Sequence, residues 1–289
     1  QARFDEERNI QWARALERSG VHVVYGLTGL KTHAKLCLVV RREGDLVRRY
    51  VHIGTGNYNP STARLYTDVG LFTCREDLGE DVADLFNHLT GFARPPRYRR
   101  ALVAPAHLRD GIIAEIERAV AGHTPETPSR VVMKMNSIID GPIIAAIYRA
   151  SQAGVPVDLI IRGITGLRPG VPGVSENVRV ISIVGRFLEH ARAFAFTVGD
   201  RTDYWIGSAD MMARNLDNRV ELVAPVDDPL ATAEIQTILD LQLADTALAW
   251  ELGADGSWSR VVPPDGAEPL NSQEQLMEYV SRQARAPGA

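Results

Sequence analysis

The sequence predicts an α/β protein in which helices cover mixed sheets, and three observations support this fold class. Short runs of β-branched and other apolar residues alternate along the chain with longer segments of helical periodicity. A proline- and arginine-rich block, Ala93–Arg100, interrupts this alternation. One compound sequence pattern occurs on both sides of the block. We therefore expect two similar α/β domains, residues 1–100 and 101–289, related by a pseudo-two-fold duplication.

The individual elements follow from periodicity and from the turn residues between them. Before the block we expect helices over residues 5–19 and 78–89, strands over 34–40, 47–53 and 69–73, and a short helix that begins at Asn59-Pro60. After the block we expect helices over residues 108–121, 142–153, 229–248 and 273–282, and strands over 131–135, 157–161, 178–183, 192–198, 204–206 and 220–223.

Composition excludes several classes of protein. With 45% hydrophobic and 24% charged residues, the 289-residue chain has the composition of a soluble globular protein. No run approaches the ~20 apolar residues of a membrane-spanning helix, and the net charge of −4 argues against a surface that coats nucleic acid. Cys37 and Cys74 are too few for a disulfide framework, so we expect buried free thiols in a reducing cytoplasm. Because the chain starts at Gln1 and enters a helical pattern at once, we interpret it as part of a longer protein.

The repeated pattern joins a histidine, a basic residue and a small-residue turn. "THAKLCLVV" is followed after a hairpin by "HIGTGNYN", and "EHARAFAFTV" is followed after a hairpin by "WIGSADMMARN". The distance from His33 to Gly54 is 21 residues, and that from His190 to Gly207 is 17. A hairpin loop absorbs a difference of this size. Two such patterns at matched spacing indicate a duplication.

The chemistry of each copy suggests a site for an anion. Residues two apart on a strand share a face, so His33 and Lys35 are expected to point together, as are His190 and Arg192. A cation beside an imidazole lowers its pKa and favours the neutral, nucleophilic form. The glycine turns would let backbone N–H groups approach an anion. Together, the two copies would hold a phosphate between two imidazoles.

Two other interpretations compete with this one. A metal site is disfavoured because Lys35 and Arg192 would repel a cation, and no further histidine or carboxylate stands at ligand spacing. A single histidine of this kind is most often an ordinary strand residue. The duplication favours a site for the pair.

These residues carry a family resemblance. The doubled histidine–basic pattern resembles the phospholipase D superfamily, in which each of two halves supplies one motif. The longer strings "QARFDEERNI", "GLKTHAKL", "YVHIGTGNYNPSTARLYTD", "RVISIVGRFLEHAR" and "SADMMARN" are similar to bacterial polyphosphate kinase, over about residues 1–248. The chain resembles the C-terminal catalytic part of that family, in two phospholipase D-like domains.

The resemblance implies reversible transfer of the ATP γ-phosphate to inorganic polyphosphate through a phosphohistidine. By motif, His33 is the phosphorylated residue and His190 is a second catalytic histidine, as a phosphate clamp or as a general acid. The positions that this implies for ATP and substrate binding are Tyr66, Arg162, His190, Lys35 and Arg192. Arg3 matches an arginine associated with Mg²⁺, and we expect it to hold the phosphates that the ion bridges, because an arginine does not ligate a cation. Phe187 stands where the family usually has tyrosine, a conservative change.

The same resemblance implies Mg²⁺ as cofactor, ATP, ADP and polyphosphate as partners, no nucleic acid, a cytoplasmic location and a homo-oligomer for the full-length protein. No transmembrane segment is expected, and peripheral association with a membrane stays open. Two alternatives remain: a phospholipase D-type phosphodiesterase, and a polyphosphate-binding fragment without catalytic activity.

Overall fold

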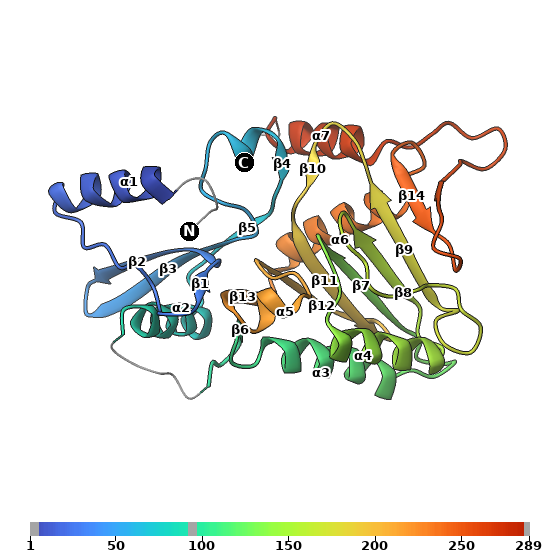
Figure 1. Cartoon of the computed structure of the whole chain (residues 1–289), viewed down its shortest axis with the longest axis horizontal. Helices are drawn as coiled ribbons and strands as arrows, with labels where there is room; N and C mark the ends of the chain where they lie inside the picture. The colour runs from blue at the N-terminus through green and yellow to red at the C-terminus, as the bar shows by residue number, and fades with distance from the viewer. Residues whose placement is uncertain (1–5, 92–96, 286–289) are drawn as a thin grey trace.

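The computed structural model describes residues 6–91 and 97–285, which form mixed α/β layers (Figure 1). The helices are α1 (Glu6–Arg18), η1 (Thr62–Arg64, a 3-10 turn), α2 (Glu76–Leu89), α3 (Leu108–Ala121), α4 (Gly141–Gln152), α5 (Ala213–Leu216), α6 (Pro229–Leu243) and α7 (Ser272–Gln283). The strands are β1 (Lys31–Thr32), β2 (Lys35–Glu43), β3 (Leu46–Gly54), β4 (Tyr66–Thr67), β5 (Gly70–Thr73), β6 (Leu102–Ala104), β7 (Ser129–Met135), β8 (Val157–Ile161), β9 (Val178–Ile183), β10 (Leu188–Glu189), β11 (Arg192–Val198), β12 (Arg201–Gly207), β13 (Arg219–Val226), β14 (Ala249–Leu252) and β15 (Trp258–Arg260).

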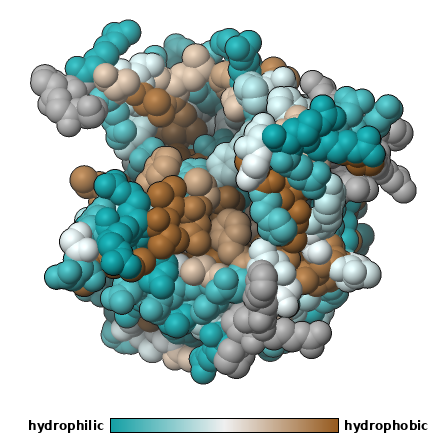
Figure 2. Space-filling view, turned by 90° about the vertical axis from the view of Figure 1, so that its left-hand side faces the viewer, coloured by the Kyte–Doolittle hydropathy of each residue, from teal (hydrophilic) through white to brown (hydrophobic). Residues whose placement is uncertain are grey.

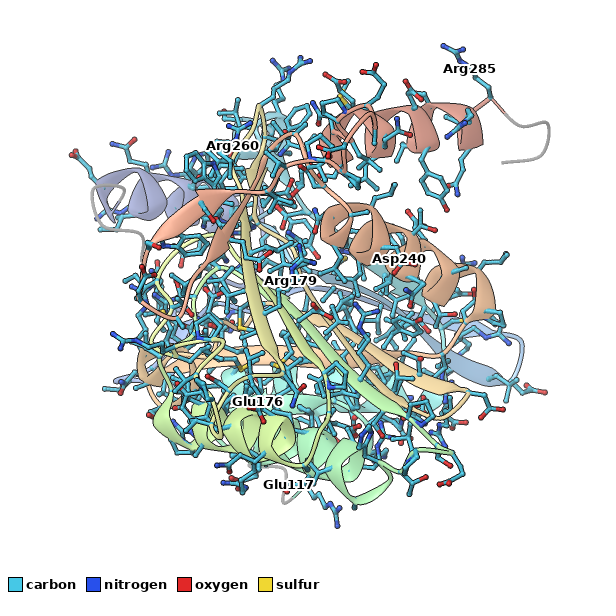
Figure 3. All side chains as sticks on the ribbon, turned by 90° about the vertical axis from the view of Figure 1, so that its right-hand side faces the viewer. Glu117, Glu176, Arg179, Asp240, Arg260 and Arg285 are labelled. Atoms are coloured by element: carbon cyan, nitrogen blue, oxygen red, sulfur yellow. The ribbon has the colours of Figure 1, made fainter. Side chains whose placement is uncertain are left out.

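The larger part of the molecule is built on one mixed sheet with the strand order β1-β13-β12-β11-β7-β8-β9-β14-β15, with β6 paired to β13. Helices α3 and α4 cover one face and α6 covers the other, as Figure 3 shows from the side of β14. All five residues of β8 are buried, as is usual for a parallel strand covered on both faces. Charged side chains such as Asp240 stand on the outward side of α6.

A smaller antiparallel sheet, β2-β3-β5, carries the first copy of the repeated pattern. Val51 and Ile53 of β3 pack with α2 on one face. The opposite face is open, and Phe72 there is 82% exposed. Figure 2 shows apolar side chains gathered on the side of the molecule that carries α1 and the β2–β3 hairpin. Cys37 and Cys74 are free as expected, but they are exposed, so the prediction of buried thiols was wrong. An apolar neighbourhood in the sequence does not show which face of a sheet is covered.

The two parts of the chain are joined through their backbones and through a shared core. Strand β1 of the first part pairs in parallel with β13 of the second, and β4 pairs in parallel with β10. One buried cluster combines Val51 and Leu85 of the first part with Val220 and Leu222 of the second. The boundary between residues 100 and 101 stays a prediction. The shared core holds the two copies of the pattern in a defined relation.

The two copies have the same local structure. In the first, Lys35 of β2 pairs with Gly54 of β3. In the second, Arg192 of β11 pairs with Gly207 of β12. In both copies a third strand then pairs with the glycine at the residue 16 positions farther along the chain. This equal register is what a duplication of one strand–hairpin–strand unit would leave behind.

Each α-helix and strand expected from the sequence is present, with small differences at the ends. The long helix expected over residues 229–248 ends at Leu243, because the Asp245 carboxylate accepts hydrogen bonds from the N–H groups of Ala247, Leu248 and Ala249 and turns the chain into β14. The short helix expected from Asn59-Pro60 is a 3-10 turn that begins two residues after Pro60. None of the described helices is long and apolar enough to cross a membrane.

Candidate functional site

His33 lies in the short link between β1 and β2, where the first part of the chain meets the second. The N–H groups of His33 and Ala34 both donate to the carbonyl oxygen of Val220, at 2.9 and 3.0 Å. The imidazole Nδ1 lies 2.8 Å from Oε2 of Glu221. Backbone and side chain of the histidine are therefore both held by β13 of the other part.

Glu221 is fully buried and makes several hydrogen bonds. Asn215 donates to Oε1 at 2.7 Å, and the hydroxyl of Ser208 donates to Oε2. An ionised carboxylate only accepts hydrogen bonds, so the proton of a neutral His33 resides on Nδ1. The lone pair of the imidazole is then on Nε2, which is the atom available to attack an electrophile.

His190 has the equivalent arrangement in the second copy. It lies just before β11, and its Nδ1 is 2.8 Å from Oδ1 of Asp68, which follows β4. The hydroxyl of Thr55 donates to the same carboxylate at 2.7 Å, as Ser208 does to Glu221. Each histidine is thus oriented by a carboxylate from the other part of the chain, so neither half of the site is complete alone.

The two carboxylates were not identified from the sequence, although a signal was present. Asp68 lies 14 residues after Gly54, and Glu221 lies 14 residues after Gly207. The repeat therefore extends beyond the glycine turn to an acidic residue in each copy. Comparing chemical type at equal spacing, instead of letters, would have found both.

The glycine turns act differently from our expectation. The N–H groups of Thr55 and Ser208 donate to backbone carbonyls of the neighbouring strand region, each at 3.0 Å, and are not free for an anion. A Cβ on Gly56 would lie 2.0 Å from an oxygen of Asp68, and one on Gly207 would lie 2.3 Å from the carbonyl oxygen of Leu222. These glycines permit close packing behind the histidines.

The pKa of each histidine is lowered, which favours the neutral form. Burial lowers the pKa of His33, and the positive charges of Lys35 and Arg219 lower it further, against the opposing effect of Glu221. Burial likewise lowers the pKa of His190, with Arg192 acting in the same direction and Asp68 against it. The sequence predicts this direction from the neighbouring cations. Burial is the larger cause.

The ammonium group of Lys35 is buried, and the hydrogen bond described for it is to a backbone carbonyl oxygen. Its side chain donates to the carbonyl oxygen of His33, and the residue is 6% exposed. Burial lowers its pKa to about 8, with Arg192 and Arg219 adding to the effect, whereas Glu221 and Asp68 oppose it. The site carries a positive charge that an anion would stabilise.

Arg192 lies beside His190, and most of its N–H groups donate hydrogen bonds to other groups of the protein. Nε and Nη2 donate to the two oxygens of Asp210, each at 3.1 Å, and Nη1 donates to the carbonyl oxygen of His190 at 2.8 Å. Nη1 is also 3.2 and 3.1 Å from the two ring nitrogens of His190, which places it over the ring face. Its role in binding substrate stays a prediction, and its evident local effect is to fix a positive charge against His190.

Arg162 and Tyr66 complete the region around His190. Nε of Arg162 donates to Oδ1 of Asn136 at 2.7 Å, and within the described part of the chain its two terminal nitrogens have no hydrogen-bond acceptor. Burial and the charge of Arg192 lower its pKa. The ring of Tyr66 lies 5.0 Å from that of His190. Contacts of both residues with ATP remain predictions, and the geometry leaves Arg162 free to make one.

The residues described here do not by themselves form a magnesium site. Asp68 and Glu221 hold the two histidines, and Asp210 is occupied by Arg192 and Asn136. Over residues 6–91 and 97–285 no group of three or more histidine, cysteine, aspartate or glutamate side chains is arranged to hold a metal ion. Arg3, which we associated with Mg²⁺, lies outside the described residues.

Comparison with known proteins shows the family. The sequence matches the family models "Polyphosphate kinase C-terminal domain 1" over residues 1–95 and "Polyphosphate kinase C-terminal domain 2" over residues 101–273. It is 54% identical to the polyphosphate kinase of Streptomyces coelicolor over 278 residues, and 57% identical to that of Synechocystis sp. over 272 residues. These matches cover 96% and 94% of the chain and 37% of each relative.

A solved structure shows the same fold. The crystal structure of polyphosphate kinase from Porphyromonas gingivalis superposes with a TM-score of 0.89 at 36% sequence identity, over 98% of this chain and 43% of that one. The chain belongs to the polyphosphate kinase family and spans a little over a third of the length of the curated relatives named above.

Proposed function

We propose that this chain supplies the catalytic centre of an enzyme that transfers the γ-phosphate of ATP reversibly to inorganic polyphosphate, through a phosphohistidine at His33. The observation that carries the proposal is the geometry of His33: its Nδ1 is 2.8 Å from the buried Glu221 carboxylate, which leaves the lone pair of the imidazole on Nε2. Family membership identifies the reaction class that fits this geometry.

In the first step, Nε2 of His33 attacks the γ-phosphorus of ATP. A nitrogen–phosphorus bond forms, and the bond from phosphorus to the β,γ-bridging oxygen breaks with its electron pair leaving on ADP. The imidazole becomes positively charged because it keeps its proton on Nδ1. Glu221, already hydrogen bonded to that proton, stabilises the charge without reorganisation.

In the second step, a terminal oxygen of polyphosphate attacks the phosphorus. The nitrogen–phosphorus bond breaks, its electron pair returns to Nε2, and His33 is neutral again. Neither step leaves a proton on the enzyme, so the sequence runs in both directions. Phosphoryl transfer depends mainly on positioning and on charge neutralisation, and in this proposal Lys35 and Arg162 supply the positive charge.

We assign His190 to contact with the phosphates of the substrate. Its hydrogen bond to Asp68 determines which protonation form can make that contact. With its Nδ1 proton directed to Asp68, a neutral His190 has only a lone pair on Nε2 and cannot donate to a phosphate oxygen. It can act as a clamp after it takes up a proton, and Asp68 and the bound anion both favour that uptake. A clamp and a general acid therefore share one protonated form.

The remaining assignments belong to the same proposal. Mg²⁺ would supply positive charge to the phosphates of the nucleotide, and Arg3 would contact those phosphates. Tyr66 contacts the nucleotide beside His190. ATP, ADP and polyphosphate are the partners of the full-length enzyme, which acts in the cytoplasm as a homo-oligomer.

The test is to incubate the protein with ATP labelled at the γ-phosphate and to look for protein-bound label that is labile to acid and stable to base. Label is expected on His33, and the His33→Ala variant should carry none. His190→Ala should still be labelled, but about two to three decades more slowly, as expected for loss of one contact to the transferring phosphate. His190→Gln, which donates a hydrogen bond without a proton transfer, should recover part of that rate if His190 is a clamp.

The controls separate this function from its rivals. The same assay belongs in the longer polypeptide as well, because the chain covers only part of its relatives. Label on His33→Ala together with none on His190→Ala would reverse the two roles. A stable adduct with bis-p-nitrophenyl phosphate and no label from ATP would instead indicate a phosphodiesterase. Binding of polyphosphate without any label in either polypeptide would indicate a binding fragment.

A further inference from the structure

One face of the smaller sheet, β2-β3-β5, is uncovered in the described part of the chain. Leu36 and Leu38 of β2 pack against the cluster that contains α2. Cys37 and Val39 alternate with them and therefore point to the opposite face, where Cys37 is exposed and Val39 is 46% exposed. Phe72 of β5 lies on this face too, in register with Cys37 across β3. A bare apolar face of this kind is typical of an interaction surface.

Helix α1 lies on the same side of the sheet but does not cover this face (Figure 1). Its own apolar residues Ile10, Trp12 and Leu16 are between 40% and 63% exposed. Both α1 and the sheet therefore present apolar side chains to solvent.

The second copy of the repeat shows what covers the equivalent face. The offset of 157 residues between the two histidines of the repeat also aligns Cys37 with Phe194 and Val39 with Phe196. Both phenylalanines are 0% exposed, and they lie in the core cluster that α3 and α4 form with the larger sheet. The first copy has the same strand but no equivalent of these two helices among the described residues.

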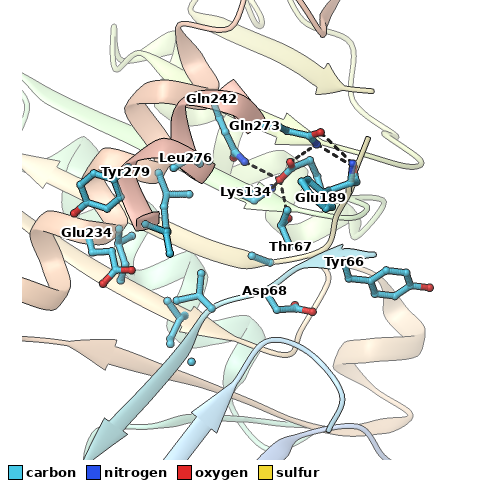
Figure 4. A pocket seen from close by; sticks show the side chains of 18 of the residues that line it. Tyr66, Thr67, Asp68, Lys134, Glu189, Glu234, Gln242, Gln273, Leu276 and Tyr279 are labelled. Atoms are coloured by element: carbon cyan, nitrogen blue, oxygen red, sulfur yellow. Dashed lines mark hydrogen bonds and ion pairs between the residues drawn. The ribbon is translucent and has the colours of Figure 1, made fainter. Parts of the chain in front are cut away.

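The other face of each sheet is covered in the same way in both copies. Helix α2 follows β5 and packs near Ile53, and α6 follows β13 and packs near the equivalent residue, Ile206. Figure 4 shows the cavity of about 560 Å³ between α6 and α7, whose lining includes Tyr66 and Asp68 and which therefore adjoins the site described above. The difference between the copies lies on the face of Cys37.

One edge of the smaller sheet is also unpaired. Within residues 6–91 and 97–285, β2 pairs only with β3 and is an edge strand. Its equivalent β11 lies between β12 and β7, and residues 193–198 pair with β7 in antiparallel sense. The same offset places the equivalent edge at residues 36–41. Such an edge presents N–H and C=O groups to which another strand can pair.

A third observation concerns residues 21–26. Their sequence, "VHVVYG", aligns at the same offset with "VRVISI", which forms β9. Strand β9 joins the larger sheet through β8, which pairs in turn with β7. Residues 21–26 have the β-branched composition of a strand but belong to none, and Val21, Val24 and Tyr25 are exposed. This segment lacks the neighbouring strands that its equivalent has.

We propose that the bare face and the free edge of β2 are the docking surface for a preceding segment of the full-length polypeptide, which consists of a strand like β7 and two amphipathic helices like α3 and α4. The strand pairs with residues 36–41, the helices cover Cys37, Val39 and Phe72, and residues 21–26 join the extended sheet. At the offset of the repeat, the positions equivalent to β7, α3 and α4 fall before residue 1. The polyphosphate kinases named above extend far beyond the matched region, which is 37% of each.

The docked segment also supports the phosphate site. Strand β2 begins at Lys35, two residues after His33, so pairing along its free edge fixes the strand that carries this cation. The proposal rests on the duplication and does not depend on the reaction proposed above.

The two native cysteines provide a test with its own control. Both are exposed in this chain. Cys37 is equivalent to the buried Phe194, whereas Cys74, after β5, is equivalent to the exposed Asp227, after β13. The rates of labelling by N-ethylmaleimide, read for each cysteine by mass spectrometry, are compared between this chain and the full-length polypeptide without nucleotide. Cys37 should react at least about 100-fold more slowly in the full-length polypeptide, and Cys74 should react at an unchanged rate.

Hydrogen exchange on the same two polypeptides tests the pairing of strands. Residues 21–26 and 36–41 should exchange at least about tenfold more slowly in the full-length polypeptide. Residues 193–198, which are paired on both sides in this chain, should not change.

Three outcomes would overturn the proposal. The first is equal labelling of Cys37, or equal exchange of residues 21–26, in the two polypeptides. The second is protection of Cys37 that is already present in this chain and increases with its concentration, which would assign the face to a second copy. The third is protection in this chain at every concentration, which would show that α1 closes over the face.

Discussion

Replacing Lys35 by methionine should make the free protein more stable while it weakens the phosphate site. Lys35 is 6% exposed, and its pKa is lowered from 10.5 to about 8, chiefly by burial and then by the charges of Arg192 and Arg219. Methionine has a similar length and no charge. The substitution removes the cost of burying an ammonium group that, without an anion, is not fully compensated.

The magnitude follows from the shift. A pKa that falls from 10.5 in the unfolded chain to about 8 in the folded protein corresponds to a cost of about 3 kcal/mol at neutral pH. Losing the hydrogen bond to the carbonyl oxygen of His33 offsets about 1 kcal/mol of the gain. We expect Lys35→Met to stabilise the protein by about 2 kcal/mol at pH 7, or by roughly 4–8 °C in Tm.

The pH dependence has a definite sign. The folded-state pKa of Lys35 is below the unfolded value, so the cost is fully present below about pH 8, declines as the pH rises, and is absent above the unfolded pKa of about 10.5. The advantage of Lys35→Met should therefore shrink between pH 8 and pH 10.5. Binding of an anion should also weaken for wild type above about pH 8, as Lys35 loses its proton.

Thermal melting at pH 7 and pH 10, with and without tripolyphosphate, measures both effects. Tripolyphosphate should raise the Tm of wild type at pH 7 and have much less effect on Lys35→Met. Arg41→Met removes a positive charge from an exposed position on the same strand, and should change stability by less than about 0.5 kcal/mol. A Lys35→Met protein that melts below wild type at pH 7 would refute the reasoning, since it would show that Lys35 is well compensated in the free site.

Three other predictions test the site. Glu221→Gln should slow labelling of His33 by ATP about 100-fold, because it removes the charge that stabilises the imidazolium, and single-turnover labelling measures the rate. When tripolyphosphate binds at pH 7, the protein should take up close to one proton, because the pKa of His190 is lowered in the free protein and a bound anion raises that pKa. Calorimetry in two buffers of different ionisation enthalpy measures this proton uptake. The His190→Gln substitution should abolish the uptake. Arg192→Lys should destabilise the protein by about 2 kcal/mol in urea unfolding, because an ammonium group cannot keep the two-point contact with Asp210.

Much of the fold was accessible from sequence because local pattern and final burial agree. The strand over Val157–Ile161 and the helix over Leu108–Ala121 have the limits that their periodicity predicts. The two-residue strands β1, β4 and β10 could not be foreseen in this way. Each exists only because it pairs with a segment far away in the chain, as Leu188 does with Tyr66. Such strands have no periodicity of their own, so tertiary contact alone determines them.

The same distinction between local pattern and tertiary contact applies to the residues of the site. His33 and His190 were identified because a histidine before a strand recurs at matched spacing, and that property is local to each copy. Asp68 and Glu221 were missed because each acts on the histidine of the other copy. An alignment of the chain with itself finds equivalent residues, but it does not reveal pairs that cross between the copies.

The two copies keep one geometry and differ in what surrounds it, and this difference supports unequal roles for the histidines. In the second copy, the basic residue Arg192 is locked to Asp210 and lies against the ring of His190, so its charge has a fixed place. In the first copy, the ammonium group of Lys35 donates to the backbone carbonyl oxygen of His33, and its pKa of about 8 leaves its charge responsive to an incoming anion. For a nucleophilic histidine, a neighbouring cation is favourable when the incoming phosphate raises the pKa of that cation and so stabilises its charge. A clamp benefits from a neighbour that stays where it is. The asymmetry therefore supports the proposal that His33 carries the covalent step, on physical grounds that the repeated pattern, which is nearly symmetric, does not contain.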